Sequence, residues 1–174
     1  MKYHLTSRIL HWLMAFLIIA NLAIGFYMKD FIANDAQNRL EIYDFHKSIG
    51  VLVIILLVFR IINRHIHKAP ALPESFKKLD VNLAKIGHIS LYILMLVVPV
   101  SGYLMSSFAG YPVKFFGVEL PAFLDTNFTF AKICSETHEI SAIALIALIA
   151  IHILAIFKHR FLDNVKINIL KRMI

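Results

Sequence analysis

Cysteine is almost absent from this chain, which contains only Cys134 among its 174 residues. A single cysteine excludes an internal disulfide framework, and it excludes zinc cages and iron–sulfur clusters built on cysteine. Charged residues are also scarce, at 17% of the chain, whereas hydrophobic residues make up 59%. Soluble domains carry about 25% charged residues, so this balance indicates a protein that lies in lipid. The mean hydropathy of +0.73 excludes a disordered chain.

Long stretches without a formal charge locate the membrane-spanning segments. The uncharged runs are residues 9–28, 48–59, 86–113 and 140–157. A membrane helix needs about 20 predominantly apolar residues, and the second run reaches this length if Asp44, Lys47 and Arg60 lie near the interfaces. The sequence therefore predicts an all-α integral membrane protein, a bundle of four transmembrane helices in a single domain over residues 1–174. The predicted helices cover about 8–29, 42–64, 82–107 and 131–158.

The first apolar segment shares a short basic start with signal peptides. Its apolar run is too long for a signal peptide, three further spans follow it, and no clear A-x-A cleavage site closes it. We therefore expect this segment to be retained as the first helix of the bundle.

Lysine and arginine are distributed unequally between the two sides of the predicted membrane. Thirteen lie on the side of the chain ends and the 60–85 connection: Lys2, Arg8, Arg60, Arg64, Lys68, Lys77, Lys78, Lys85, Lys158, Arg160, Lys166, Lys171 and Arg172. Three acidic residues join this side: Glu74, Asp80 and Asp163. The two sides then carry formal charges of +10 and −3, and the positive-inside rule places both termini in the cytoplasm. No basic–aromatic stripe accompanies this charge, so we expect no nucleic-acid partner.

Five of the nine histidines fall inside the predicted helices, and they fall at two depths. The inner level, near the cytoplasmic ends, holds His11, His88 and His152, and the outer level holds His46 and His138. Along the fourth helix His138 and His152 are 14 residues apart, which gives about 21 Å of rise and an angular offset of about 40°. Both therefore face the middle of one bundle, near opposite membrane surfaces.

Histidines stacked in this way are suited to haem iron, which helix bundles hold with side chains from facing helices. Histidine on both axial faces leaves no open position, so electron transfer is the natural use. One alternative is that the histidines make interhelical hydrogen bonds, each contributing about 0.6 kcal/mol. Another is zinc, but zinc sites usually recruit carboxylates or thiols as well, and the only acids nearby are Asp44, Glu136 and Glu139, all at the outer level. We expect His4, His65 and His67 to be solvated.

At this point four motifs resemble the bacterial di-haem cytochrome b561 family, which is related to the cytochrome b subunits of nickel hydrogenases and formate dehydrogenases. The motifs are Arg8-Ile9-Leu10-His11-Trp12, Phe45-His46-Lys47-Ser48-Ile49-Gly50, Lys85-Ile86-Gly87-His88-Ile89-Ser90-Leu91-Tyr92, and Thr137-His138-Glu139 with His152 downstream. The resemblance covers essentially the whole chain, and it implies two haem b groups in the bacterial inner membrane. It also implies the axial pairs: His11 with His152 for the inner iron, and His46 with His138 for the outer iron.

Other polar residues are then candidates for the rest of the cofactor chemistry. Haem propionates are anionic, so Arg8, Arg60 and Arg64 are candidate partners, among which we favour Arg60; the alternative is snorkelling to lipid headgroups. His88 is left over at the inner level, where it either meets a propionate, a water or a quinone, or packs as a hydrogen-bonded histidine. His159 lies two turns beyond His152 and is a candidate to exchange protons with a quinone. We favour the alternative that it is a surface histidine.

The resemblance implies electron transfer coupled to ubiquinone or another quinone. Some members of the family are superoxide oxidases, which pass an electron from periplasmic superoxide through the haems to ubiquinone, and others exchange electrons with an extracytoplasmic redox protein. Lysines and carboxylates occur together at the outer level, so composition does not favour superoxide over a protein donor. Two alternatives remain: an anchor subunit of a larger dehydrogenase or hydrogenase, and a haem-free transporter or channel that uses a histidine relay. Membrane lipid is the other expected partner, and the sequence predicts no oligomeric state.

Overall fold

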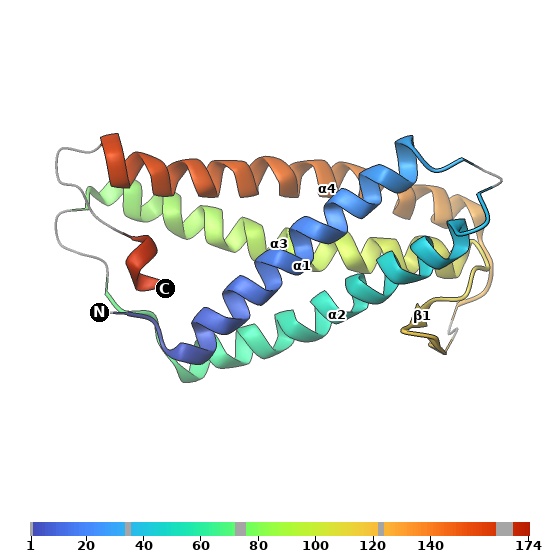
Figure 1. Ribbon diagram of the computed structural model, residues 1–174, viewed down its shortest axis with the longest axis horizontal. Helices are drawn as coiled ribbons and strands as arrows, with labels where there is room; N and C mark the ends of the chain where they lie inside the picture. Colours follow the sequence, from blue (N-terminus) through green and yellow to red (C-terminus); the bar gives the residue numbers. More distant parts are fainter. Residues whose placement is uncertain (1, 34–35, 72–75, 122–123, 163–168) are drawn as a thin grey trace.

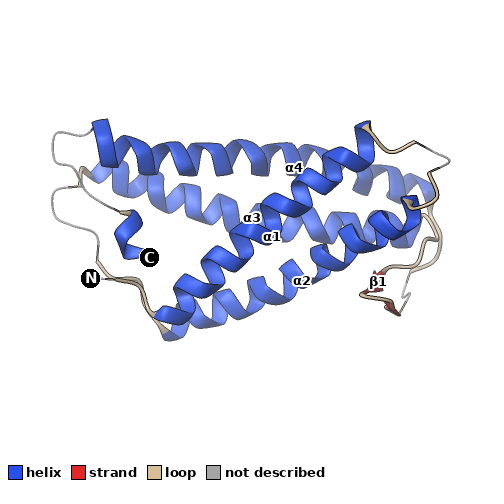
Figure 2. Ribbon diagram, in the orientation of Figure 1, coloured by secondary structure: helices blue, strands red, loops and turns tan. Residues whose placement is uncertain are grey.

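The computed structural model describes residues 2–33, 36–71, 76–121, 124–162 and 169–174, and these consist mostly of helix (Figure 2). The long helices are α1 (Leu5–Asp30), α2 (Arg39–Ile66), α3 (Lys78–Phe108) and α4 (Phe128–Phe157). Within the described residues, four helices are long and apolar enough to cross a membrane, which confirms the predicted fold class. Each begins three or four residues earlier than predicted, because the helix continues through the polar residues at the interface and keeps its backbone groups paired.

Shorter elements occupy the two ends of the bundle. α4 continues directly into a π-helical turn, η1 (Lys158–Leu162), and a 3-10 turn, η2 (Leu170–Arg172), lies near the C-terminus. At the other end, β1 (Lys114–Phe115) and β2 (Val118–Glu119) form an antiparallel hairpin. Four residues from the charge count, Asp35, Glu74, Asp163 and Lys166, lie outside the described residues.

The helices follow one another around the bundle. α1 packs mainly on α2, α2 on α3, and α3 on α4, and α3 and α4 run side by side along their length (Figure 1). Both ends of the chain lie at one end of the bundle, and the hairpin lies at the other (Figure 1). This arrangement agrees with four spans, while the side of the membrane on which the termini lie stays a prediction.

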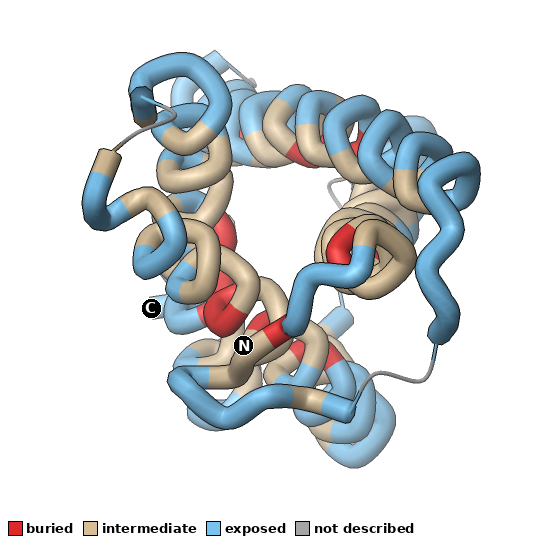
Figure 3. Tube along the Cα trace, turned by 90° about the vertical axis from the view of Figure 1, so that its right-hand side faces the viewer, coloured by how far each residue is buried: buried red, intermediate tan, exposed pale blue. Residues whose placement is uncertain are grey.

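The core is a stripe of residues spaced one helical turn apart. Met14 and Ile18 of α1 meet a row on α2 that includes Ile49, Val53 and Leu57, each 8% exposed or less. Seen along the long axis, the buried positions lie on the sides of the helices that face one another (Figure 3). Large apolar side chains cover the outward faces, as expected of helices that face lipid rather than water.

Ser48 fixes the outer hairpin onto α2. The Ser48 hydroxyl donates to the Asp44 carbonyl at 2.7 Å and accepts from the Phe116 N–H at 3.0 Å. Lys114 of β1 adds an ion pair with the Asp44 carboxylate at 3.1 Å. Gly117, with φ of +92°, makes the turn that an L side chain would strain. The hairpin therefore covers the outer end of α2, two residues from His46.

Removing a core side chain tests this packing. Leu57 is 1% exposed, so we expect Leu57→Ala to lower the free energy of unfolding by roughly 2–3 kcal/mol through lost van der Waals contacts. Leu154→Ala is the matched control, because Leu154 is 64% exposed on the outward face of α4 and should change stability by less than about 0.5 kcal/mol. Unfolding in mixed micelles with SDS, followed by circular dichroism, measures both; equal losses would contradict this core.

Candidate functional site

Two pairs of histidines face each other across the bundle, one pair at each end. His11 of α1 and His152 of α4 have ring centroids 6.4 Å apart, and we call them the inner pair after the predicted side. His46 of α2 and His138 of α4 have ring centroids 6.2 Å apart, and we call them the outer pair. In both pairs the rings are steeply inclined to each other, by 64° and 82°. α4 thus contributes one histidine to each pair, as the spacing of 14 residues requires.

The outer pair is held by a backbone carbonyl and two glycines. Nδ1 of His138 donates to the Val98 carbonyl at 2.7 Å, which leaves Nε2 as the nitrogen with a free lone pair. A Cβ placed at Gly102 would lie 2.9 Å from the His138 ring, and one at Gly25 would lie 3.3 Å from the His46 ring. Nothing in the sequence pattern pairs these two glycines with the histidine rings.

The outer pair also shows an unmet hydrogen-bonding demand. The buried Nδ1 of His46 has no hydrogen-bond partner among the described residues. Buried polar atoms are normally paired, and this nitrogen lies on the side of the ring that approaches Gly25 of α1, which leaves Nε2 as the nitrogen available to a metal ion.

Arg60 of α2 contacts the inner pair through His11. Its Nη2 donates to Nδ1 of His11 at 3.2 Å, and its Nε donates to the Tyr92 hydroxyl at 3.1 Å. Nη1 of Arg60 and Nε of Arg8 are buried without a partner among the described residues. A buried guanidinium needs an anionic acceptor, and these atoms therefore indicate room for one beside His11. The role of Tyr92 as a partner of Arg60 was missed in the sequence.

The third inner histidine lies next to the pair. The His88 and His152 rings have centroids 5.6 Å apart, so the His152 ring neighbours both the His11 ring and the His88 ring. Nδ1 of His88 donates to the Ala84 carbonyl of its own helix at 2.6 Å, which leaves Nε2 available. The structure therefore keeps three imidazoles at the inner level, as predicted.

The expectation that His159 is a surface residue is wrong. Its side chain is buried, with 9% exposed, and the Phe76 ring lies 5.0 Å from its ring. The physical reason is local, because α4 continues into the π-helical turn η1 and Phe76, from the segment before α3, covers the imidazole. His4 and His65 are exposed as expected, and the His4 ring stacks on His67 with centroids 3.8 Å apart.

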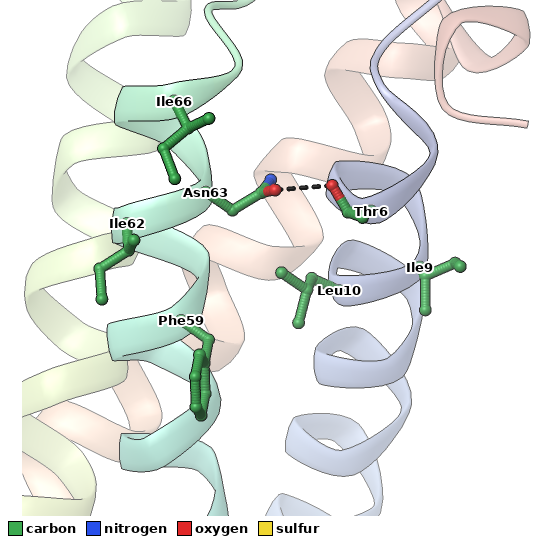
Figure 4. Close-up of a pocket in the computed structure, with 7 residues that line it drawn as sticks. All are labelled: Thr6, Ile9, Leu10, Phe59, Ile62, Asn63 and Ile66. Atoms are coloured by element: carbon green, nitrogen blue, oxygen red, sulfur yellow. Dashed lines mark hydrogen bonds between the residues drawn. The ribbon is translucent and has the colours of Figure 1, made fainter.

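A groove between α1 and α2 lies near the inner pair but offers iron no ligand. It encloses about 400 Å³, and its lining is mostly aliphatic (Figure 4). Its polar end is a bond from the Thr6 hydroxyl to Oδ1 of Asn63 at 2.6 Å, and Asn63 in turn donates to Ser7 at 2.7 Å. The groove contains no titratable side chain and suits a lipid chain.

A comparison with known families now decides the identity of the fold. The model of the family described as prokaryotic cytochrome b561 matches residues 2–174. The chain belongs to this family. It is therefore a membrane cytochrome that binds haem b and transfers electrons, and the resemblance expected from the histidine motifs is confirmed.

Relatives of this cytochrome match over nearly its whole length. It is 32% identical to cytochrome b561 homolog 2 of Escherichia coli (strain K12), over 99% of this chain and 91% of the relative. It is 25% identical to cytochrome b561 homolog 1 of the same organism, over 99% of this chain and 96% of the relative. It is 26% identical to the probable superoxide oxidase CybB of Yersinia pestis, over 99% of this chain and 95% of the relative.

The histidine pairs of this cytochrome fit haem iron. Metal–nitrogen distances to histidine are about 2 Å, so two imidazoles on one metal atom have ring centres roughly 6 Å apart, which agrees with both observed separations. Zinc fits poorly, because the described residues contain no group of three or more histidine, cysteine, aspartate or glutamate side chains arranged for a metal ion. The glycines at the outer pair give the two imidazole rings the room they occupy, and the unpaired arginine atoms at the inner pair supply positive charge that suits haem propionates.

Adding a methyl group at the outer pair tests this fit. We expect Gly102→Ala to lower the haem bound per chain, because its Cβ would lie 2.9 Å from a ring that the Val98 carbonyl holds in place. Gly25→Ala should have a smaller effect, since its closest contact is 3.3 Å, and Gly87→Ala is the matched control because nothing lies within 4 Å of its Cβ. Pyridine haemochrome assays on purified protein give the number of haems per chain. Equal haem content in all three variants would contradict the inference that Gly102 and Gly25 make room for the outer pair.

Proposed function

We propose that this cytochrome holds two haem b groups, one at each end of the bundle. His11 and His152 are the axial ligands of the inner iron, and His46 and His138 are those of the outer iron. The observation that carries the proposal is the recurrence of one geometry, with ring centroids 6.4 and 6.2 Å apart, at two levels about 21 Å apart along α4. Packing alone gives no reason for a second copy of this geometry.

The tautomer of His138 supports the assignment. The Val98 carbonyl holds the proton of His138 on Nδ1, the arrangement in which metal-bound histidines are normally held. His11 differs, because its Nδ1 accepts from Arg60. With iron held through Nε2, the proton of His11 would lie on Nδ1, and Arg60 would need another acceptor. We propose that a haem propionate is that acceptor.

The bound haems supply one-electron redox chemistry, and the chain supplies their protection. Both axial positions are filled by histidine, so no coordination position is left open for oxygen. We propose that the electrons enter the quinone pool, with His88 and His159 as candidate residues for the quinone. A quinone takes up two protons with two electrons, and imidazole exchanges protons near neutral pH. His88 is exposed and His159 is buried, so the two imidazoles would exchange protons with a quinone in surroundings that differ in their access to solvent.

Charge supports electron flow from the outer level to the inner level. Arg8, Arg60 and Arg64 lie toward the inner end, where two of them have buried unpaired nitrogens. At the outer end Asp44 and Glu139 form ion pairs with Lys114 and Lys29. Because negative charge is stabilised near cations, this distribution favours an electron at the inner level. With both termini in the cytoplasm of a bacterial cell, that direction runs inward across the inner membrane.

We propose superoxide as the electron donor, a donor that leaves as O2 when it gives up its electron. One relative is named as a probable superoxide oxidase, and at the outer end the Lys47 ammonium forms no ion pair with a carboxylate among the described residues. Lys47, next to His46, donates to the Pro112 carbonyl at 3.3 Å. A periplasmic redox protein is the competing donor, and docking to a larger dehydrogenase or hydrogenase is the competing arrangement.

Removing one outer ligand tests the two-haem assignment. We expect His138→Ala to lower the haem content from about two to about one per chain, since the inner pair keeps both of its ligands. His65→Ala is the control, because His65 is exposed and bonds only to the Ile61 carbonyl of its own helix. The haem content and the reduced-minus-oxidised spectrum are measured on detergent-purified protein. One haem per wild-type chain, or loss of both in a correctly inserted variant, refutes the assignment.

Stopped-flow mixing with superoxide tests the donor. We expect rapid reduction of the haems by superoxide alone, followed by reoxidation when ubiquinone is present. Lys47→Gln should slow the reduction several-fold at low salt and less at high salt, because a surface field is screened by ions. Reduction no faster than with a superoxide-free control excludes superoxide and favours a protein donor.

A further inference from the structure

The last residues of the chain return to the bundle and join two of its segments. Residues 169–174, which we call the C-terminal segment, lie beside the start of α1 (Figure 1). The Tyr3 N–H donates to the Arg172 carbonyl at 3.0 Å. The Arg172 guanidinium donates to the carbonyls of Pro70 and Ala71 at 2.7 and 2.8 Å, and it lies over the Tyr3 ring. Arg172 therefore ties the C-terminal segment to α1 and to the α2–α3 connection.

Trp12 links this segment to the inner pair. Its indole N–H donates to the Met173 carbonyl at 2.8 Å, and its ring meets the His11 ring edge-on, with centroids 5.3 Å apart. Adjacent residues on a helix do not normally face each other, so this contact requires the indole to turn toward His11. The bond to Met173 supplies a reason for that turn.

A simpler interpretation is that Trp12 only anchors the helix at the membrane interface, where tryptophan is common. An interfacial anchor directs its N–H to water or lipid headgroups. Here the N–H is bonded to a carbonyl of the same chain, in a segment that Arg172 holds with two further bonds. The contacts therefore form one connected path from the α2–α3 connection to the His11 ring.

We propose that Trp12 and Arg172 are positioning residues for the inner haem. The C-terminal segment, held by Arg172, fixes the indole of Trp12, and the indole fixes the ring plane of His11 and limits the access of water to the inner pair. Groups that orient a ligating histidine and exclude solvent tune the redox potential of its metal. This inference rests on the assignment of His11 and His152 to an inner haem.

The test uses two conservative variants of the full-length, haem-loaded protein. Trp12→Phe keeps an aromatic ring but removes the N–H, and Arg172→Lys keeps the charge but removes the forked donor. We expect both to change the electron paramagnetic resonance signal of the inner haem and to lower its potential, because water stabilises the charged ferric form. The outer haem should keep its signal and potential. The double variant should shift no further than the larger single shift, since both act on one path.

Arg160→Lys is the matched control, because Arg160 lies at the same end over the Phe161 ring and should leave both haems unchanged. An unaltered inner haem in Trp12→Phe, with both haems bound, overturns the inference and leaves the two-haem assignment intact. Equal shifts in both haems also overturn it, because they indicate general loosening. One haem in the wild-type chain contradicts the proposed function itself. If either Trp12→Phe or Arg172→Lys loses both haems through poor folding, the spectrum and potential of the other variant test the inference.

Discussion

The structure depends on imidazole rings that face each other from helices which otherwise have little direct contact. α1 packs mainly on α2, and α4 packs mainly on α3. The His11 ring of α1 and the His152 ring of α4 nevertheless lie with their centroids 6.4 Å apart. At the other end Lys29 and Glu139 join the same two helices. Coordination to a shared metal would complete this contact, because it fixes the distance between two rings more strictly than apolar packing does. A metal held between the histidines would therefore also set the spacing of the helices.

The surroundings of the two pairs differ in a way that matters for redox chemistry. The outer pair is shaped by neutral backbone, with a carbonyl on His138 and a glycine beside each ring. The inner pair is shaped by charge, with Arg60 in direct contact with His11. A carbonyl acceptor increases the basicity of a ligating imidazole, whereas a nearby cation stabilises an added electron. With haem iron held at both pairs, as proposed, two sites with the same ligands would differ in their affinity for an electron, as a chain of carriers requires.

Sequence reasoning succeeded where the information lies along one helix. Charge-free runs gave the four spans, and a spacing of 14 residues placed His138 and His152 on one face of α4. It failed where a contact joins distant segments. Phe76 covers His159, and Tyr92 binds Arg60, and neither contact has a periodic signal. The role of Gly102 likewise depends on His138, which only the packing of α3 on α4 brings near.

Chain from outside the membrane spans is attached at each end of the bundle, and in both cases the attachment lies beside a histidine. A ligand one or two turns from a helix end lies close to water, which would weaken every electrostatic interaction at the site. At the outer end Ser48 fixes the hairpin through Phe116, two residues from His46. At the inner end Met173 meets Trp12, one residue from His11. In each case the residue that holds the cover is a close sequence neighbour of a histidine, so the helix that presents the ligand also presents the anchor for its cover. A shift of that helix would then move ligand and cover together and keep the site closed.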